Sequence, residues 1–238
     1  MTDKHQADTL TITPPGEAPD AEEPVEEKVS TFRLVATLAF AGILAGILLA
    51  LVNEHTKPII DAYRAEQLRL AVYEVLPKAA RYTTYYLVDG QLNTALPAGA
   101  KESDYKRLFA GFGEDGQPVG VAVSRGESGF QDIVLVIMGF DPVRGTVSGM
   151  KVLESKETPG LGDKIFKDQE WVDQFFAEPK FPLVPVKPGS GRGAANEVDT
   201  ITGATISTKI VIQIINNAIA EWMPLLEQGV PEEEQPQG

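Results

Sequence analysis

Apolar residues follow three patterns along the chain: a long uninterrupted run near the start, short runs in the middle, and a helical repeat near the end. The short runs alternate or are continuously apolar, which predicts strands over residues 82–88, 91–96, 107–112, 119–124, 133–140 and 145–153. Asp89-Gly90 and Glu114-Asp115-Gly116 separate pairs of these runs and are typical of hairpin turns. We therefore predict an α+β domain with a mixed, mainly antiparallel sheet and flanking helices.

Two helices are predicted after the strands. Ile206 to Met223 places apolar residues three and four positions apart, which indicates a helix with one buried face. Asp163 is expected to cap another helix that continues to Phe176. Between the two, residues 181–187 alternate but contain prolines, which restrict this segment to an edge strand at best. Residues 227–238 are expected to form a polar tail.

The segment Leu34–Val52 is an apolar run of nineteen residues without a charge. As a helix, at about 1.5 Å per residue, it spans most of a ~30 Å hydrocarbon core, so we predict one transmembrane helix over residues 32–53. A signal peptide is the competing interpretation, but its apolar region would be shorter and nearer the terminus. An uncleaved anchor is therefore favoured. Gly42 and Gly46 have the spacing that lets a partner helix pack closely.

A stalk helix is expected over residues 54–77, between the membrane and the folded domain. Pro58 is expected to break the backbone just past the membrane, and Pro77 to stop the helix. Charge does not decide the orientation of the span, because basic residues flank it on both sides. These residues are Lys28 and Arg33 before it, and Lys57, Arg64 and Arg69 after it.

The net charge of −13 is concentrated at the two ends of the chain. Residues 1–31 carry two lysines against eight acidic residues and are expected to form a disordered acidic tail. Binding to nucleic acid is not expected from a chain of this charge. The sequence contains no cysteine and two histidines, His5 and His55, so it offers no basis for an iron–sulfur, haem or zinc site. An electron carrier held by this chain would be an organic cofactor.

The clearest candidate chemistry lies in residues 199–205, Asp-Thr-Ile-Thr-Gly-Ala-Thr, directly before the C-terminal helix. The start of a helix favours an anion such as phosphate, because its first backbone N–H groups are free and the helix dipole is positive there. Gly203 and Ala204 would let a ligand approach the backbone. The simpler interpretation is a helix cap, with Asp199 near the positive end. The candidate capping hydroxyls are those of Thr202, Thr205 and Ser207.

Two further loops are rich in glycine. Residues 157–162, Glu-Thr-Pro-Gly-Leu-Gly, form a constrained loop with bare backbone that is equally well explained, by itself, as a simple turn. Residues 189–194, Gly-Ser-Gly-Arg-Gly-Ala, have glycines spaced as in dinucleotide-binding loops. Prolines precede them and no helix opens within them, so a mobile loop is the preferred interpretation of this segment.

Together, the motifs at residues 199–205 and 157–162 resemble the two signatures of the FMN-binding domain family. The first is similar to the family's flavinylation motif, Asp-x-x-(Ser/Thr)-Gly-Ala-Thr. The resemblance implies an FMN-binding domain over residues 78–226 and FMN attached covalently, through its phosphate, to the hydroxyl of Thr205. The other cofactor-binding residues it implies are Thr202, Gly203, Ala204, Asp199, Glu157, Thr158, Leu161 and Gly162.

With its single predicted span, the chain most resembles the G subunits of Rnf ion-translocating electron-transport complexes. The C subunits of sodium-translocating NADH:quinone reductases are relatives and an alternative. The resemblance implies an electron-carrying flavoprotein of the bacterial inner membrane, with its domain on the periplasmic side and no small substrate of its own. It also implies other membrane subunits as partners and a flavin transferase that uses FAD for maturation.

Two functions of other classes remain open at this point. A non-redox scaffold would only hold other membrane subunits through its single helix, and it would contain no bound flavin. A flavin reductase acting alone would need a dinucleotide site, for which residues 189–194 are the available candidate.

Overall fold

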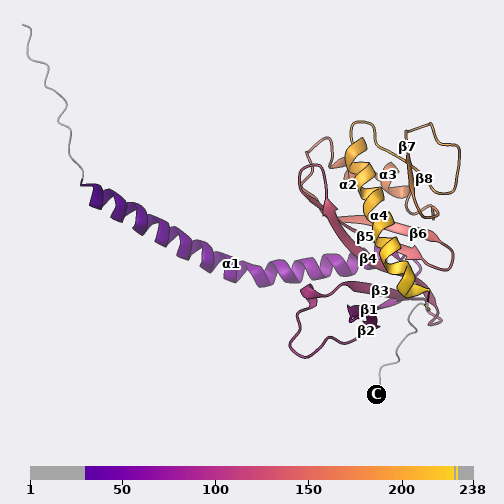
Figure 1. Ribbon diagram of the computed structural model, residues 1–238, viewed down its shortest axis with the longest axis horizontal. Coiled ribbons are helices and arrows are strands. Elements are labelled where there is room, and N and C mark those ends of the chain that lie inside the picture. The colour runs from indigo at the N-terminus through magenta and orange to yellow at the C-terminus, as the bar shows by residue number, and fades with distance from the viewer. Residues whose placement is uncertain (1–29, 228, 230–238) are drawn as a thin grey trace, which may run out of the picture. The chain divides into compact units, whose positions relative to one another are not determined.

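The computed structural model describes residues 30–227 and residue 229 (Figure 1). The chain divides into two units, residues 1–56 and 57–238, and each is considered by itself. Most of the two predicted tails, residues 1–31 and 227–238, lies outside the described residues.

The described part of the first unit is almost entirely the N-terminal part of helix α1 (Thr31–Val75). Its apolar side chains are exposed, and a stretch of eighteen residues has a mean hydropathy of 2.6 with none of it buried. By length and composition this helix can cross a membrane. The expected break at Pro58 is wrong, because Pro58 lies inside α1. A proline removes one intrahelical hydrogen bond, and the residues around Pro58 keep their helical conformation despite this loss.

The second unit is built on a six-stranded sheet with the order β2-β1-β3-β4-β5-β6, in which every neighbouring pair is antiparallel. The strands are β1 (Arg81–Val88), β2 (Gln91–Asn93), β3 (Arg107–Phe112), β4 (Pro118–Ser128), β5 (Ile133–Asp141) and β6 (Thr146–Glu154). The predicted α+β class and the antiparallel sheet are confirmed. Strand β2 is shorter than predicted and β4 is longer, because edge pairing and bulges set strand ends that apolar periodicity does not encode.

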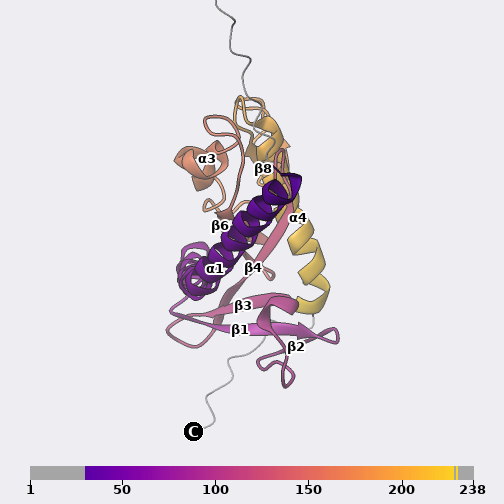
Figure 2. The same ribbon diagram turned by 90° about the vertical axis from the view of Figure 1, so that its left-hand side faces the viewer.

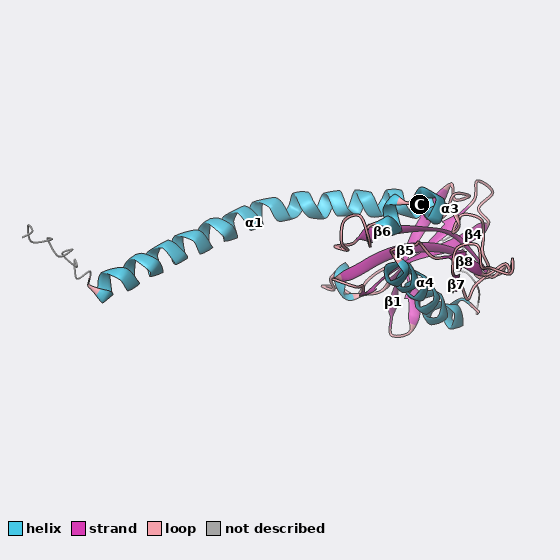
Figure 3. Cartoon of the chain, turned by 90° about the horizontal axis from the view of Figure 1, so that it is seen from above, coloured by secondary structure: helices cyan, strands magenta, loops and turns pink. Residues whose placement is uncertain are grey.

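Both faces of this sheet are buried. Phe109, Ala122 and Ile137 face the C-terminal part of α1, while their neighbours along the same strands face the opposite side. On that opposite side lies helix α4 (Thr205–Leu226), and Figure 3 shows the two helices on different sides of the strands. The alternation of side chains along a strand explains how one sheet supplies two cores.

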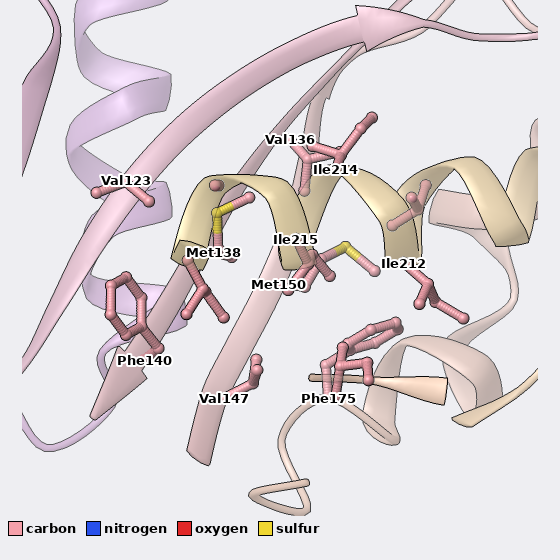
Figure 4. Close-up of a cluster of buried hydrophobic side chains, with 14 of the residues drawn as sticks. Val123, Val136, Met138, Phe140, Val147, Met150, Phe175, Ile212, Ile214 and Ile215 are labelled. Carbon is pink, nitrogen blue, oxygen red and sulfur yellow. The ribbon is translucent and has the colours of Figure 1, made fainter. Parts of the chain in front are cut away.

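Helix α4 packs its apolar face across β4 and β5 (Figure 4). Ile212, Ile214 and Ile215 are almost completely buried against strand side chains such as Met138 and Phe140. Each such side chain contributes about 1.5–3 kcal/mol of hydrophobic free energy, so this face holds the helix firmly in place. The predicted helix over residues 206–223 is confirmed, and the structure extends it by one turn at most at each end.

A network of ion pairs in the C-terminal half of α4 helps to orient this helix on the sheet. The carboxylate of Glu221 pairs with Lys106 and, at 2.5 Å, with Arg125 of β4. Arg125 also pairs with Glu127, which accepts a hydrogen bond of 3.0 Å from the side chain of Asn217. These half-exposed ion pairs contribute little free energy each, but together they fix the helix relative to β3 and β4.

The single helix predicted from Asp163 to Phe176 is instead two short helices, α2 (Lys164–Lys167) and α3 (Gln169–Asp173). Asp168 separates them, because its extended backbone (φ −83°, ψ 95°) interrupts the helix. Its side chain accepts a hydrogen bond of 3.2 Å from Trp171 N and caps α3. A residue that caps in this way competes with helix continuation, which is why the apolar repeat across Asp168 was misleading.

The predicted edge strand at residues 181–187 is confirmed in part as β7 (Val184–Val186). It pairs in parallel with β8 (Glu197–Asp199) in a separate two-stranded sheet. Strand β8 was not predicted, because three residues are too few to show a period. A short 3-10 helix, η1 (Glu102–Asp104), was missed for the same reason. Both views in Figures 1 and 2 place β8 and α3 at the opposite end of the domain from β1 and β2.

The end of α1 approaches the sheet through glycine. Gly139 of β5 and Gly149 of β6 face each other across the strands, directly below Val75. A Cβ at Gly139 would lie 2.2 Å from the backbone oxygen of Val75, and Ser148 donates a hydrogen bond of 2.7 Å to the same oxygen. Side chains at these two positions would therefore push the helix away from the sheet.

We predict that Gly139→Ala lowers the free energy of unfolding by about 1–3 kcal/mol, because the new methyl group overlaps backbone that cannot move independently. Gly126→Ala in β4 is the matched control. Its Cβ would meet Ile133 at 3.2 Å, and Ile133 is exposed and free to shift, so the change should stay within about 0.5 kcal/mol. Urea unfolding followed by circular dichroism measures both variants, and equal effects would contradict the role of the close approach.

Candidate functional site

The two predicted motifs meet at one pocket of about 350 Å³. One wall comes from the loop that follows β6, and the other from the turn that leads into α4. Residues from a third segment, the turn between β4 and β5, complete the site. The lining residues are Phe130, Glu157, Thr158, Leu161, Gly162, Gly203, Ala204, Thr205, Ile206 and Ser207.

The loop after β6 is shaped by a proline–glycine turn. Leu161 N donates to the carbonyl of Thr158 at 3.1 Å, and Pro159 and Gly160 occupy the two central positions. Gly160 has a φ of +80°, the positive value that a type II turn requires at this position. Asp163 then accepts hydrogen bonds from Gly160 N at 2.7 Å and from Lys167 at 2.6 Å. Asp163 thus stabilises this loop. The predicted cap is wrong in one respect: the Asp163 side chain makes no capping hydrogen bond to α2.

The approach to α4 uses a second turn of the same kind. Ala204 N donates to the carbonyl of Ile201 at 3.0 Å, and Gly203 has a φ of +84°. An ideal Cβ at Gly203 would meet no atom within 4 Å, so the backbone is bare on this side. Ala204 is the N-cap residue and makes no side-chain cap. The capping interpretation of the nearby hydroxyls is therefore not confirmed.

Thr205 is the first residue of α4 and is exposed. Its hydroxyl donates to the carbonyl of Ile201 at 3.4 Å, a long contact that is easily replaced. Among the described residues, the backbone N–H groups of Thr205, Ile206 and Ser207 donate to no other backbone group. An accessible hydroxyl beside free amides at the positive end of a 22-residue helix suits a phosphate group.

Glu157 holds the three segments together. Its side chain is buried, with 6% of the residue exposed. One carboxylate oxygen accepts hydrogen bonds from Phe130 N at 2.8 Å and from Gln131 N at 3.1 Å. The other oxygen accepts a hydrogen bond of 2.8 Å from the hydroxyl of Ser207 in α4. Three donors satisfy the carboxylate, which burial would otherwise penalise.

The pocket also has an apolar rim. Phe130, Leu161 and Ile206 line it and remain 64%, 53% and 57% exposed. Sequence reasoning missed Phe130 and Ile206 because neither belongs to a glycine-rich motif. Phe130 stands in the Gly129–Asp132 turn, where an aromatic residue among polar and glycine residues between two predicted strands was the available signal. Apolar side chains around a polar centre are usual for a cofactor site.

An ion pair supports the turn that carries Phe130. Lys156 donates to Asp132 at 2.7 Å and so connects the turn to the segment before Glu157. This hydrogen bond, with another from Ile133 N, holds the pKa of the Asp132 carboxyl below its usual value. The two loops are therefore linked outside the pocket as well as within it.

Two predicted site residues lie elsewhere. Asp199 and Thr202 line a neighbouring hollow, on the side of α3, and do not line the pocket that contains Thr205. The backbone of Asp199 is fixed by Trp171 Nε1, which donates to its carbonyl at 2.7 Å, and by Gln174, which accepts from its N–H at 2.7 Å. The other seven predicted residues line the pocket together.

The glycine-rich loop at residues 189–194 folds around a carboxylate of its own chain. The N–H groups of Arg192, Gly193 and Ala194 donate to one oxygen of Glu197, at 2.7, 2.9 and 3.2 Å. Such a nest of amides binds anions, and here Glu197 occupies it. A dinucleotide phosphate would have to displace this side chain, which argues against a dinucleotide site in this loop.

A larger hollow of about 710 Å³ lies between residues 59–68 of α1 and the sheet. Its lining is mainly apolar and contains neither motif. Within residues 30–227, no group of three or more His, Asp or Glu residues is arranged to hold a metal ion. The pocket at the start of α4 therefore remains the candidate functional site.

Comparison with known proteins identifies related chains. The family model described as "FMN-binding domain" matches residues 129–220. The G subunit of the Na(+)-translocating ferredoxin:NAD(+) oxidoreductase complex of Acetobacterium woodii is 32% identical over 196 residues, which cover 82% of this chain and 92% of that protein. The G subunit of the ion-translocating oxidoreductase complex of Escherichia coli K12 is 30% identical, with 72% and 81% covered.

Among solved structures, the chain is similar to NqrC of Shewanella oneidensis. The TM-score is 0.58 at 19% sequence identity, and the match covers 71% of this chain and 100% of that chain. At this identity the likeness shows a shared fold, and it supports the antiparallel sheet with α4 across it.

We predict that Asp163 contributes stability that depends on pH. The hydrogen bond from Lys167, with another from Gly160 N, lowers the pKa of Asp163 below its ordinary value despite burial. A lowered folded-state pKa gives stability that is present above the unfolded value of about 3.9 and is lost as pH falls through the folded value. Asp163→Asn should therefore be less stable than the wild type at pH 7, and the difference should shrink from about pH 5 downward.

Urea unfolding of both proteins at several pH values between 7 and 3 measures this difference. Asp173→Asn, in which the replaced carboxylate is in α3 and away from the pocket lining, serves as the control. A wild-type advantage over Asp163→Asn that stays constant down to pH 3 would show that the carboxylate charge is not what stabilises the loop.

Proposed function

Because the chain belongs to the family of the G subunits of ion-translocating oxidoreductase complexes and contains an FMN-binding domain, we propose that it is the membrane-anchored flavoprotein subunit of an Rnf-type complex. In this function it carries electrons between other subunits and has no independent substrate site. The observation that carries the proposal is the meeting of both motifs at one pocket, with the exposed Thr205 hydroxyl at its edge.

The residues of the pocket fit FMN in three respects. The bare backbone at Gly203 and the free amides at the start of α4 suit a phosphate group. The apolar rim of Phe130, Leu161 and Ile206 suits a planar aromatic ring system. When bound, FMN supplies the electron-accepting and electron-donating chemistry, and the protein supplies position and environment.

Covalent attachment through Thr205 is part of this proposal. With FAD as the donor, the Thr205 oxygen forms a bond to the phosphorus of the FMN half, and the bond from that phosphorus to the bridging oxygen breaks. AMP leaves with that oxygen, and the hydroxyl proton is released. No histidine or lysine lies among the pocket residues to activate the hydroxyl, so the base is expected to come from a separate flavin transferase.

Asp199 and Thr202 have a different part in this proposal. Since they line the neighbouring hollow, we assign them to recognition by the transferase, or to magnesium positioning during transfer, in place of contact with the bound flavin. The hydroxyl of Ser207 donates to Glu157 and is buried, whereas that of Thr205 is accessible. This difference favours Thr205 as the acceptor.

Helix α1 is proposed as an uncleaved anchor in the bacterial inner membrane, with the FMN-binding domain on the periplasmic side. The apolar, exposed surface of residues 34–52 supports the anchor, and the resemblance to the G subunits supports the side. The equivalent subunit of a sodium-translocating quinone reductase remains the second candidate, since the fold of NqrC is shared. A non-redox scaffold subunit would not require an accessible hydroxyl at this pocket.

We predict that Thr205→Val abolishes covalent flavin, because valine keeps the shape of threonine and removes the oxygen. Full-length protein, produced together with a flavin transferase, should show a fluorescent band on a denaturing gel and an intact mass raised by one FMN less one water. The variant should show neither. Since Thr205 does not cap α4, its free energy of unfolding should change by less than about 0.5 kcal/mol.

Thr202→Val and Ser207→Ala test the two other hydroxyls near the start of α4. Both should keep at least part of the fluorescence, because neither removes the proposed acceptor oxygen. A fluorescent Thr205→Val together with a dark Ser207→Ala would mean that the acceptor is Ser207. A wild-type protein with the bare sequence mass would contradict covalent attachment altogether.

We predict that the full-length protein stays in the membrane fraction after a carbonate wash, because residues 34–52 form an uncharged apolar run that spans most of the hydrocarbon core. A variant that lacks residues 1–56 should be released into the soluble fraction and still accept flavin, since the sheet, α4 and the pocket all lie in the second unit. Full-length protein in the soluble fraction after the wash would exclude the anchor.

A further inference from the structure

The carboxylate of Glu157 is the point at which three segments distant in the sequence meet. It accepts hydrogen bonds from two amides of the β4–β5 turn and from a hydroxyl of α4, while its own backbone belongs to the loop after β6. All three segments contribute lining residues to the pocket. Glu157 is the one carboxylate among the residues that line the pocket.

Two glycines leave room for this carboxylate. A Cβ at Gly129 would lie 2.5 Å from one oxygen of Glu157, and a Cβ at Gly162 would lie 2.5 Å from the other. Neither glycine has a positive φ, so backbone conformation does not require glycine there. Space for the Glu157 side chain is therefore one physical reason for glycine at both positions, and at Gly129 the carbonyl oxygen of Asp132, 2.6 Å from the same Cβ, is a second.

We propose that Glu157 is a positioning residue of the flavin site, which acts through its hydrogen bonds and not through its charge. This inference rests on the proposed function. The carboxylate tethers the N–H of Phe130 and so holds its exposed ring at the pocket rim. It also engages the hydroxyl of Ser207, which leaves Thr205 as the available acceptor on the first turn of α4.

Two conservative substitutions distinguish the effect of the length of the Glu157 side chain from the effect of its charge. Glu157→Gln loses the charge but keeps the length: its oxygen can accept from Phe130 N and Gln131 N, and its NH₂ group can donate to Ser207. Glu157→Asp keeps the charge but is shorter by one methylene group, so its carboxylate cannot contact both the turn and α4. Both changes are small, and both variants are expected to fold.

The first measurement is hydrogen–deuterium exchange of full-length protein in detergent micelles, without flavin, followed by mass spectrometry of the segment around residues 129–132. In Glu157→Asp the amides of Phe130 and Gln131 should exchange about tenfold faster than in the wild type, as expected for the loss of a hydrogen bond to a charged acceptor. In Glu157→Gln they should exchange within about threefold of the wild-type rate.

The second measurement uses protein produced together with the flavin transferase. Glu157→Gln should retain the wild-type flavin absorption spectrum and midpoint potential, while Glu157→Asp should shift both and should attach part of its flavin to Ser207, as located by peptide mass spectrometry. The reverse order, with Glu157→Gln shifted and Glu157→Asp unchanged, would overturn the positioning role and assign the effect to charge.

The outcomes for the two proposals are distinct. Wild-type protein that takes up no flavin would overturn the proposed function, whatever the exchange rates. Flavin-loaded wild-type protein with unchanged exchange and spectra in Glu157→Asp would overturn the positioning role alone.

Discussion

The apolar face of α4 packs across β4 and β5, and the position of every other part of the site depends on this contact. Ile212, Ile214 and Ile215 are almost fully buried there, and Glu221 adds ion pairs to Lys106, directly before β3, and to Arg125 of β4. Because the helix cannot rotate without exposing these side chains, its first residue is fixed in space. Thr205 therefore starts the helix beside the loop after β6 and the turn between β4 and β5.

The same helix start presents three hydroxyls with three different environments. Thr205 is accessible, Ser207 is buried and donates to Glu157, and Thr208 is buried and donates to the carbonyls of Ala204 and Thr205. In the proposed attachment, a modifying enzyme would reach the hydroxyl that is free of strong partners. Selection of one acceptor would then follow from hydrogen bonding around α4, without any difference in the intrinsic chemistry of serine and threonine.

The shallow, open form of the pocket agrees with an electron carrier. Phe130, Leu161 and Ile206 are each more than half exposed, so a cofactor held among them would lie close to the surface and within reach of a partner subunit. A covalent bond would compensate for the weak enclosure, because the cofactor could not dissociate between electron transfers. The apolar span of α1 would keep such a carrier beside its membrane partners.

The sequence by itself determined the α+β class, the main strands, the apolar span and the two motifs, since each depends on local periodicity or on fixed residue spacing. Seven of the nine cofactor-binding residues that the resemblance implies line one pocket. Tertiary structure alone decided that Asp199 and Thr202 line a separate hollow. Two local hydrogen-bonding patterns were also missed, because apolar periodicity does not encode them: Glu197 fills the loop at residues 189–194, and Asp168 interrupts a helix. The contacts of Glu157 are also tertiary, since Phe130 lies 27 residues before it and Ser207 lies 50 residues after it. Sheet register and helix packing bring these residues together, and no local sequence pattern encodes either of them.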